Sequence, residues 1–301
     1  MRRRAGVAFA TATALAGCGG SGDTTGSVKK ATATPAPMKL AELPGGGRTI
    51  LPGKRVVGFY GHPAARQLGI LGIGKPDLAG QRLLRQVKPY ERKTRPVLPA
   101  MELLATIATA APGEDGKYRT RTTGKVIRRY LEAARKVDAI LLLDIQPGKA
   151  DFFTETTRLE KYLKEPDVGL ALDPEWRVSG SQVPGKVIGS VSSREVNATT
   201  AWLDQLVQRR KLPQKLVVIH QFTNDMVRNK SKLQERKGLA IVLNADGFGD
   251  RAVKESKYHA FTKGPTRFHD GFKLFYEEDV GLMTPKQVLR LKPPPDFVVY
   301  E

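Results

Sequence analysis

Cysteine is almost absent from this chain, whose 301 residues contain only Cys18. A single thiol forms no internal disulfide, so the folded part must be stabilised by an ordinary hydrophobic core. Long hydrophobic runs are also missing, and no apolar stretch reaches the roughly 20 residues of a membrane-spanning helix. A composition of 40% hydrophobic and 27% charged residues is typical of a globular protein.

Histidine is scarce as well. The four histidines, His62, His220, His259 and His269, show no His-x-x-x-His spacing and no glutamate-flanked pair. We therefore expect no metal and no other cofactor, although His220 with strand-end carboxylates stays open as a metal site. The serine-hydrolase pattern Gly-x-Ser-x-Gly is missing too.

The amino terminus carries an export signal. Three arginines precede a short apolar stretch, residues 5–14, and small residues follow. The segment Leu15-Ala16-Gly17-Cys18 resembles the lipobox of bacterial lipoproteins. The resemblance implies that residues 1–17 are removed and that Cys18 becomes the lipidated amino terminus. Acyl chains such as palmitate would then hold the protein at the outer face of the cell membrane. The alternative is an ordinary signal peptide with an incidental cysteine.

Residues 18–52 differ in composition from the rest of the chain. They are rich in Gly, Ser, Thr, Ala and Pro and have too few apolar residues to offset the entropy of ordering. We expect a flexible tether over 18–52 and one folded domain over 53–301.

The formal net charge of +20 is strongly basic. Basic clusters at residues 88–95, 128–129 and 209–211 contain few of the aromatic residues that stack on bases, so we expect no nucleic-acid partner. Anionic lipid head groups or acidic wall polymers fit this charge and the expected compartment better. A solvated basic surface without a partner is the alternative.

Short apolar runs recur after residue 54. Each is too short for a helix and lacks alternation, which is typical of strands covered on both faces in a parallel sheet. The runs cover residues 55–60, 96–101, 139–145, 168–172, 186–191, 215–219, 239–243 and 272–276. Residues 296–300 form either a ninth strand or the true eighth strand, in which case 272–276 is a supplementary one.

Helical patterns separate most of these runs. They cover residues 81–87, 126–137, 154–163, 197–210, 252–261 and 285–291, and the clearest, 126–137, is strongly amphipathic. Eight strands alternating with helices over about 245 residues predict an α/β fold, a (β/α)8 TIM-like barrel. One βα unit is irregular after Leu172. An open doubly wound sheet is the alternative, but Gly69, Gly72 and Gly74 have the wrong spacing for its glycine fingerprint.

Function in parallel α/β folds collects at the carboxyl ends of the strands. Polar side chains stand at those ends here, and we expect them to line one carboxylate-rich mouth. The candidate ligand-binding residues are Tyr60, His62, Glu102, Asp144, Trp176, His220, Gln221, Asn244 and Glu277. For any single carboxylate the alternative is a helix cap or a surface ion pair, and for the histidines and aromatic residues it is core packing.

The sharpest local signal is Asp173-Pro174-Glu175. On an extended chain both carboxylates would point to the same side, where each raises the pKa of the other. Trp176 beside them offers a flat face to a sugar ring. An acid kept protonated near neutral pH can protonate a leaving oxygen.

The segment from Gly169 to Trp176 resembles the fourth-strand Asp-x-Glu of barrel glycosidases that act on N-acetylated sugars, the chitinase-like and muramidase-like families. The resemblance implies that Glu175 is the general acid and that Asp173 orients the acetamido group. If Asp173 is not the second catalytic carboxylate, Asp246 from across the barrel is the best alternative. The chain departs from the chitinase pattern at Gly169 and Ala171, where that pattern has aspartates, and at Pro174.

Residues 96–301 as a whole resemble a group of actinobacterial lipoproteins that have no assigned activity. That resemblance implies lipidation and a barrel but no reaction. We therefore expect a cell-envelope lipoprotein with a glycosidase-like barrel that hydrolyses or binds envelope polysaccharide. The competing hypothesis is a barrel that binds an envelope ligand without catalysis.

Overall fold

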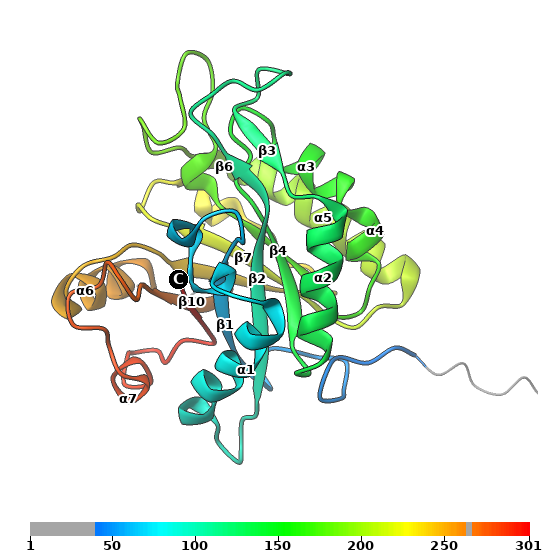
Figure 1. The fold of residues 1–301 in the computed structure, drawn as a ribbon, viewed down its shortest axis with the longest axis vertical. Helices are drawn as coiled ribbons and strands as arrows, with labels where there is room; N and C mark the ends of the chain where they lie inside the picture. The colour runs from blue at the N-terminus through cyan, green and yellow to red at the C-terminus, as the bar shows by residue number, and fades with distance from the viewer. Residues whose placement is uncertain (1–39, 263–266) are drawn as a thin grey trace, which may run out of the picture. The chain divides into compact units, whose positions relative to one another are not determined.

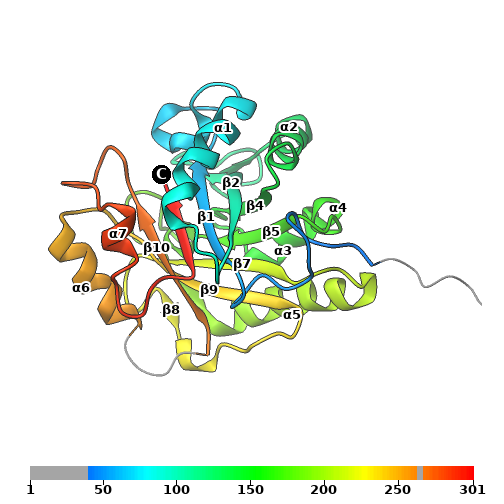
Figure 2. The same cartoon turned by 90° about the horizontal axis from the view of Figure 1, so that it is seen from below.

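Eight parallel strands close into a barrel at the centre of the molecule, and helices surround it (Figures 1 and 2). The computed structural model describes residues 40–262 and 267–301. The expected signal peptide, Cys18 and the tether up to residue 39 lie outside these ranges. The predicted (β/α)8 TIM-like barrel is confirmed, and the open doubly wound sheet is excluded, because β1 pairs with both β2 and β11 and leaves no edge.

The barrel follows the order of the chain. Its strands are β1 (Arg55–Gly61), β2 (Val97–Ala108), β4 (Ile140–Ile145), β5 (Val168–Leu172), β7 (Lys215–Gln221), β9 (Leu239–Ala245), β10 (His269–Leu274) and β11 (Phe297–Tyr300). Each pairs in parallel with the next. The remaining strands are β3 (Arg119–Arg121), which pairs antiparallel with the end of β2, and a small pair outside the barrel, β6 (Val191–Ser192) with β8 (Val227–Arg228).

The strand expected at 186–191 is wrong, since only its last residue enters a strand, β6, outside the barrel. Val187 and Ile188 are exposed, so this apolar run covers no sheet. The backbone of Gly189 instead packs against the turn that follows β5, where a Cβ would lie 2.5 Å from the carbonyl oxygens of Glu175 and Arg177. The eighth barrel strand is β11, and β10 is the seventh.

The helices lie where the amphipathic patterns predict them, with shifted ends. They are α1 (Pro76–Val87), α2 (Gly124–Arg135), α3 (Phe152–Arg158), α4 (Glu160–Leu163), α5 (Ser193–Arg210), α6 (Arg251–Thr262) and α7 (Pro285–Val288). Side-chain caps set several starts: Thr123 accepts from the Val126 N–H ahead of α2, and Ser192 accepts from the Glu195 N–H ahead of α5. No helix in the described ranges has the length and hydropathy to cross a bilayer.

Alternate residues of each strand point into the barrel, and those near its amino-terminal end are apolar. This inner cluster includes Val56, Leu98, Ile140, Leu142, Ala171, Leu216, Val218, Ala240, Val242, Phe297 and Val299. A second cluster packs the outer faces of the strands against the helices. Because this cluster fills the amino-terminal part of the barrel lumen, polar side chains can occupy the lumen only at the carboxyl ends of the strands.

Residues 40–52 close the amino-terminal end of the barrel, although a tether was expected there. Leu43, Ile50 and Leu51 are buried in the inner cluster. The side chain of Gln214, just before β7, accepts from the Ile50 N–H at 2.6 Å and from the Leu51 N–H at 3.1 Å. This part of the expected tether is therefore folded, because three apolar side chains find a place in the barrel.

Candidate functional site

A layer of polar side chains fills the barrel at the carboxyl ends of its strands. Because side chains alternate along a strand, these residues share the lumen with the apolar cluster beneath them. The layer comprises Tyr60, Glu102, Asp144, Asp173, His220, Asn244, Asp246, Lys273 and Glu301, which come from all eight barrel strands or the residues directly after them. Most of the strand-end positions proposed from the sequence are thus brought together.

His220 on β7 joins two carboxylates across the lumen. Its Nε2 lies 2.8 Å from Glu102 Oε1, and its Nδ1 lies 2.9 Å from Asp246 Oδ2. The side-chain amide of Asn244 lies 3.1 Å from the same Nδ1. Burial would lower the pKa of His220, but Glu102 and Asp246 together raise it well above its ordinary value. The two carboxylates therefore favour the protonated imidazole, which can donate to both of them.

Lys273 on β10 is a second buried cation. Its Nζ lies 3.1 Å from Asp246 Oδ2, 2.6 Å from Glu301 Oε2 and 3.9 Å from the centre of the Tyr60 ring. Burial would lower the pKa of Lys273, yet Asp246 and Glu301 raise it well above its usual value. Burial likewise works against ionisation of Asp246, but Lys273 and His220 hold its pKa well below the usual range. The two cations therefore favour the ionised form of Asp246.

Tyr60, Asp144, Gln146 and Asp173 form a second hydrogen-bonded group. The Tyr60 hydroxyl donates to Asp144 Oδ2 at 3.0 Å and accepts from Gln146 Nε2 at 3.2 Å. Gln146 Nε2 also lies 3.5 Å from Asp173 Oδ2. Burial, with the charge of Glu102 nearby, raises the pKa of Asp144 to about 7. Burial and then Asp144 raise the pKa of Asp173 well above its usual value. Ionisation is therefore harder for these two carboxyl groups than for Asp246.

Glu175 lies in a 3-10 turn, Pro174–Trp176, directly after β5, and not on an extended chain as expected. Its side chain is half-buried, and no hydrogen-bond donor or ion partner meets its carboxyl group among residues 40–262 and 267–301. With Trp176 and residues 185–188 it lines a hollow of about 150 Å³. Burial, followed by the charge of Asp246, raises the pKa of Glu175 to about 6.

Three proposed mouth residues lie outside this network. His62 bonds to the loop around it, with Nε2 2.9 Å from Thr122 Oγ1. Gln221 follows His220 and so faces the other side of β7, where its Oε1 accepts from Lys230 Nζ at 2.9 Å. Glu277 forms an exposed ion pair with Arg66.

Lys273, Glu301 and Gln146 were not among the proposed site residues. The only sequence feature that marks Lys273 is its place inside the apolar run 272–276. A buried strand rarely contains a charged residue without a partner. Glu301 follows an apolar strand as the other strand-end acids do. Gln146 stands two residues beyond Asp144, so the alternation along β4 could have identified it.

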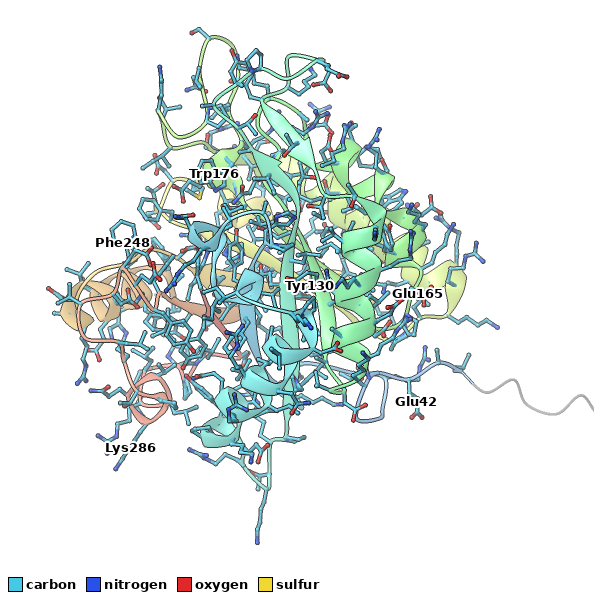
Figure 3. All side chains as sticks on the ribbon, viewed as in Figure 1. Glu42, Tyr130, Glu165, Trp176, Phe248 and Lys286 are labelled. Carbon is cyan, nitrogen blue, oxygen red and sulfur yellow. The ribbon has the colours of Figure 1, made fainter. Side chains whose placement is uncertain are left out.

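A larger hollow lies away from the acidic network. It measures about 840 Å³ and runs between β8 and α6, and its lining includes Asn224, Asp225, Arg228 and Lys230. None of the lumen carboxylates reaches it. Figure 3 shows Trp176 and Phe248 on the loops that follow β5 and β9, and Phe248 is exposed.

A scan against models of protein families finds no match to this chain, and a search of curated proteins finds none either.

Proposed function

We propose that this protein is a glycoside hydrolase that acts on N-acetylated envelope polysaccharide, with Glu175 as general acid and Asp173 as its positioning partner. One observation carries the proposal. Glu175 is a half-buried carboxyl group without a hydrogen-bond partner in the described ranges, its pKa is raised to about 6, and it shares a hollow with an aromatic side chain. Such a group keeps its proton to a higher pH than an ordinary glutamate does, and it is free to give that proton to a leaving oxygen.

The surrounding residues favour a substrate-assisted reaction. Asp246 already accepts bonds from His220, from Lys273 and, at 2.6 Å, from the Gly247 N–H, so it is poorly placed to attack a sugar as a nucleophile. In the proposed reaction the acetamido oxygen of the substrate attacks the anomeric carbon while Glu175 protonates the departing oxygen. Asp173, in its ionised form, would accept a hydrogen bond from the acetamido N–H. Water then attacks the anomeric carbon and opens the cyclic intermediate, and the Glu175 carboxylate takes up the proton that this water loses.

Binding without turnover is the second candidate, and the burial of the inner carboxyl groups favours it. Asp144 is 0% and Asp173 4% exposed, and the hollow beside Glu175 is small. Asp173 does not line this hollow, so a sugar bound there does not meet it directly. A protein that holds a sugar end against Trp176 needs no contact with Asp173.

The deciding experiment measures reducing-end release from purified peptidoglycan and wall polysaccharides. We expect release by the wild type and its loss, by at least about a hundredfold, in Glu175→Gln. Glu277→Gln is the matched control, because Glu277 is an exposed strand-end glutamate paired with Arg66. Activity that survives Glu175→Gln would remove Glu175 as the acid. Polysaccharide binding by the wild type with no release would favour the second candidate.

We also propose, from the amino-terminal sequence alone, that lipid on Cys18 holds the barrel at the outer face of the membrane. The basic charge of the chain suits anionic polymers of the envelope.

A further inference from the structure

The polar layer contains three residues arranged as metal ligands. Glu102, Asp144 and His220 each offer one ligand atom, and these atoms all lie within 4.8 Å of one another. The three side chains come from β2, β4 and β7, so the closed barrel holds them in place. We propose that they bind a divalent cation in the barrel lumen. This site goes beyond the proposed hydrolase, whose reaction uses Asp173 and Glu175 and needs no metal.

Two free oxygens provide an independent observation. Glu102 Oε2 and Asp144 Oδ1 are fully buried and have no hydrogen-bond partner within residues 40–262 and 267–301. Buried carboxylate oxygens almost always have one, because an unpaired polar atom in the interior is costly. When the two carboxyl groups are ionised, both orphan atoms are acceptors, so the missing partner is a cation or a donor and not an anion.

The groups around the ligands are those that orient metal-binding side chains. Histidines that bind metals usually donate their second ring N–H to a carboxylate, and His220 Nδ1 lies 2.9 Å from Asp246 Oδ2. The Tyr60 hydroxyl likewise holds Asp144 by Oδ2 at 3.0 Å and leaves Oδ1 free. Binding requires that the proton on His220 Nε2, which faces Glu102 Oε1 at 2.8 Å, and any proton on Asp144 leave to solvent as the cation enters.

The ligand set also indicates the class of ion. One imidazole with two carboxylates suits first-row ions such as Zn²⁺ and Mn²⁺ better than Ca²⁺ or Mg²⁺, which prefer oxygen ligands alone. Bonds of about 2.0–2.2 Å to a central ion place two ligand atoms roughly 3–3.5 Å apart. The present ligand atoms lie within 4.8 Å of one another, so the three side chains would draw closer together around the ion.

The test is calorimetric titration of the purified, chelator-treated protein with Zn²⁺ and with Mn²⁺, with Mg²⁺ as the comparison ion. We expect one ion per chain, and at least about tenfold weaker binding in Glu102→Gln and in Asp144→Asn. Glu277→Gln should bind as the wild type does. Tyr60→Phe keeps the ring over Lys273 and removes only the hydroxyl that holds Asp144, so it should weaken binding to a smaller extent.

Crystals of the wild type soaked in Zn²⁺ keep the proposal testable if a ligand variant does not fold. An anomalous peak within bonding distance of Glu102, Asp144 and His220 would support it. No peak there, no binding of either ion, or binding that the ligand variants leave unchanged would overturn it. Since every readout is binding, these results are independent of whether the protein hydrolyses a polysaccharide.

Discussion

Glu175 determines how the proposed activity depends on pH. Its pKa is raised to about 6, mainly by burial, and the protonated form is the one that donates. Activity should therefore be present below about pH 6 and fall about tenfold for each pH unit above it. The measurement is kcat/KM on a soluble chitin or peptidoglycan fragment from about pH 4.5 to about pH 8.5. Activity that keeps rising above about pH 7 would show that Glu175 is not the acid.

Lys273 should matter for stability as well as for the site. Lys273→Met leaves Glu301 without its cation and removes one of the two cations beside Asp246, and an unpaired buried charge costs about 3–5 kcal/mol. Urea unfolding measures the loss. Lys286→Met is the control, since Lys286 is exposed and points away from the molecule (Figure 3), and it should change stability by less than about 0.5 kcal/mol. Equal effects of the two substitutions would contradict the buried pairing.

The sequence could predict the acids of the site better than its cations. Glu102, Asp144 and Asp246 stand next to apolar runs, so strand position alone identified them. Gln221 and Glu277 also follow apolar runs, but Gln221 faces the outside of the barrel and Glu277 faces solvent. Which side a residue faces depends on where each strand ends, and apolar runs do not define that to one residue.

At the scale of elements, the segment from Leu40 to Pro52 differs most from expectation. Its composition suggests a tether, but Leu43, Ile50 and Leu51 fill the amino-terminal end of the barrel. Composition does not reveal this because three apolar residues in a polar segment gain burial only when a ready-made apolar surface lies next to them. The run 186–191 shows the opposite error, being apolar in sequence and exposed in the structure.

Ile50→Ala tests the role of that segment. Ile50 is 1% exposed, and truncating a buried isoleucine costs about 2–5 kcal/mol. Leu40→Ala is the matched control, because Leu40 belongs to the same segment and is 41% exposed. Denaturant unfolding should separate the two substitutions clearly. Similar small losses for both would mean that the segment does not contribute to the folded barrel.

At the scale of the whole molecule, the spacing of strands and helices was enough to predict the barrel. The alternation of apolar runs with amphipathic helices indicates the barrel, and the missing glycine fingerprint disfavours an open sheet. Seven of the eight predicted runs are barrel strands, and β11 takes the place of the run 186–191. Closure itself depends on β11 meeting β1, where Phe297 lies beside Val56. From the sequence alone, β11 could be either the eighth or a ninth strand, because the run 186–191 resembles a strand equally well.

The membrane anchor remains a prediction about the whole chain. Cys18→Ser removes the only sulfur that could carry lipid. We expect the wild type, expressed in an actinobacterial host, to incorporate labelled palmitate and to sediment with membranes, and the variant to lose both properties. Label that persists in the variant would show that Cys18 is not the lipidated residue.

Mass spectrometry of the products tests the central claim most directly. Purified protein is incubated with a defined N-acetylated oligosaccharide in excess, and the masses are followed over time. Our account predicts many cleaved molecules per protein molecule, each with the mass of one added water, and no cleavage by Glu175→Gln. An oligosaccharide that binds to the wild type and is recovered intact would contradict a hydrolytic role for this barrel.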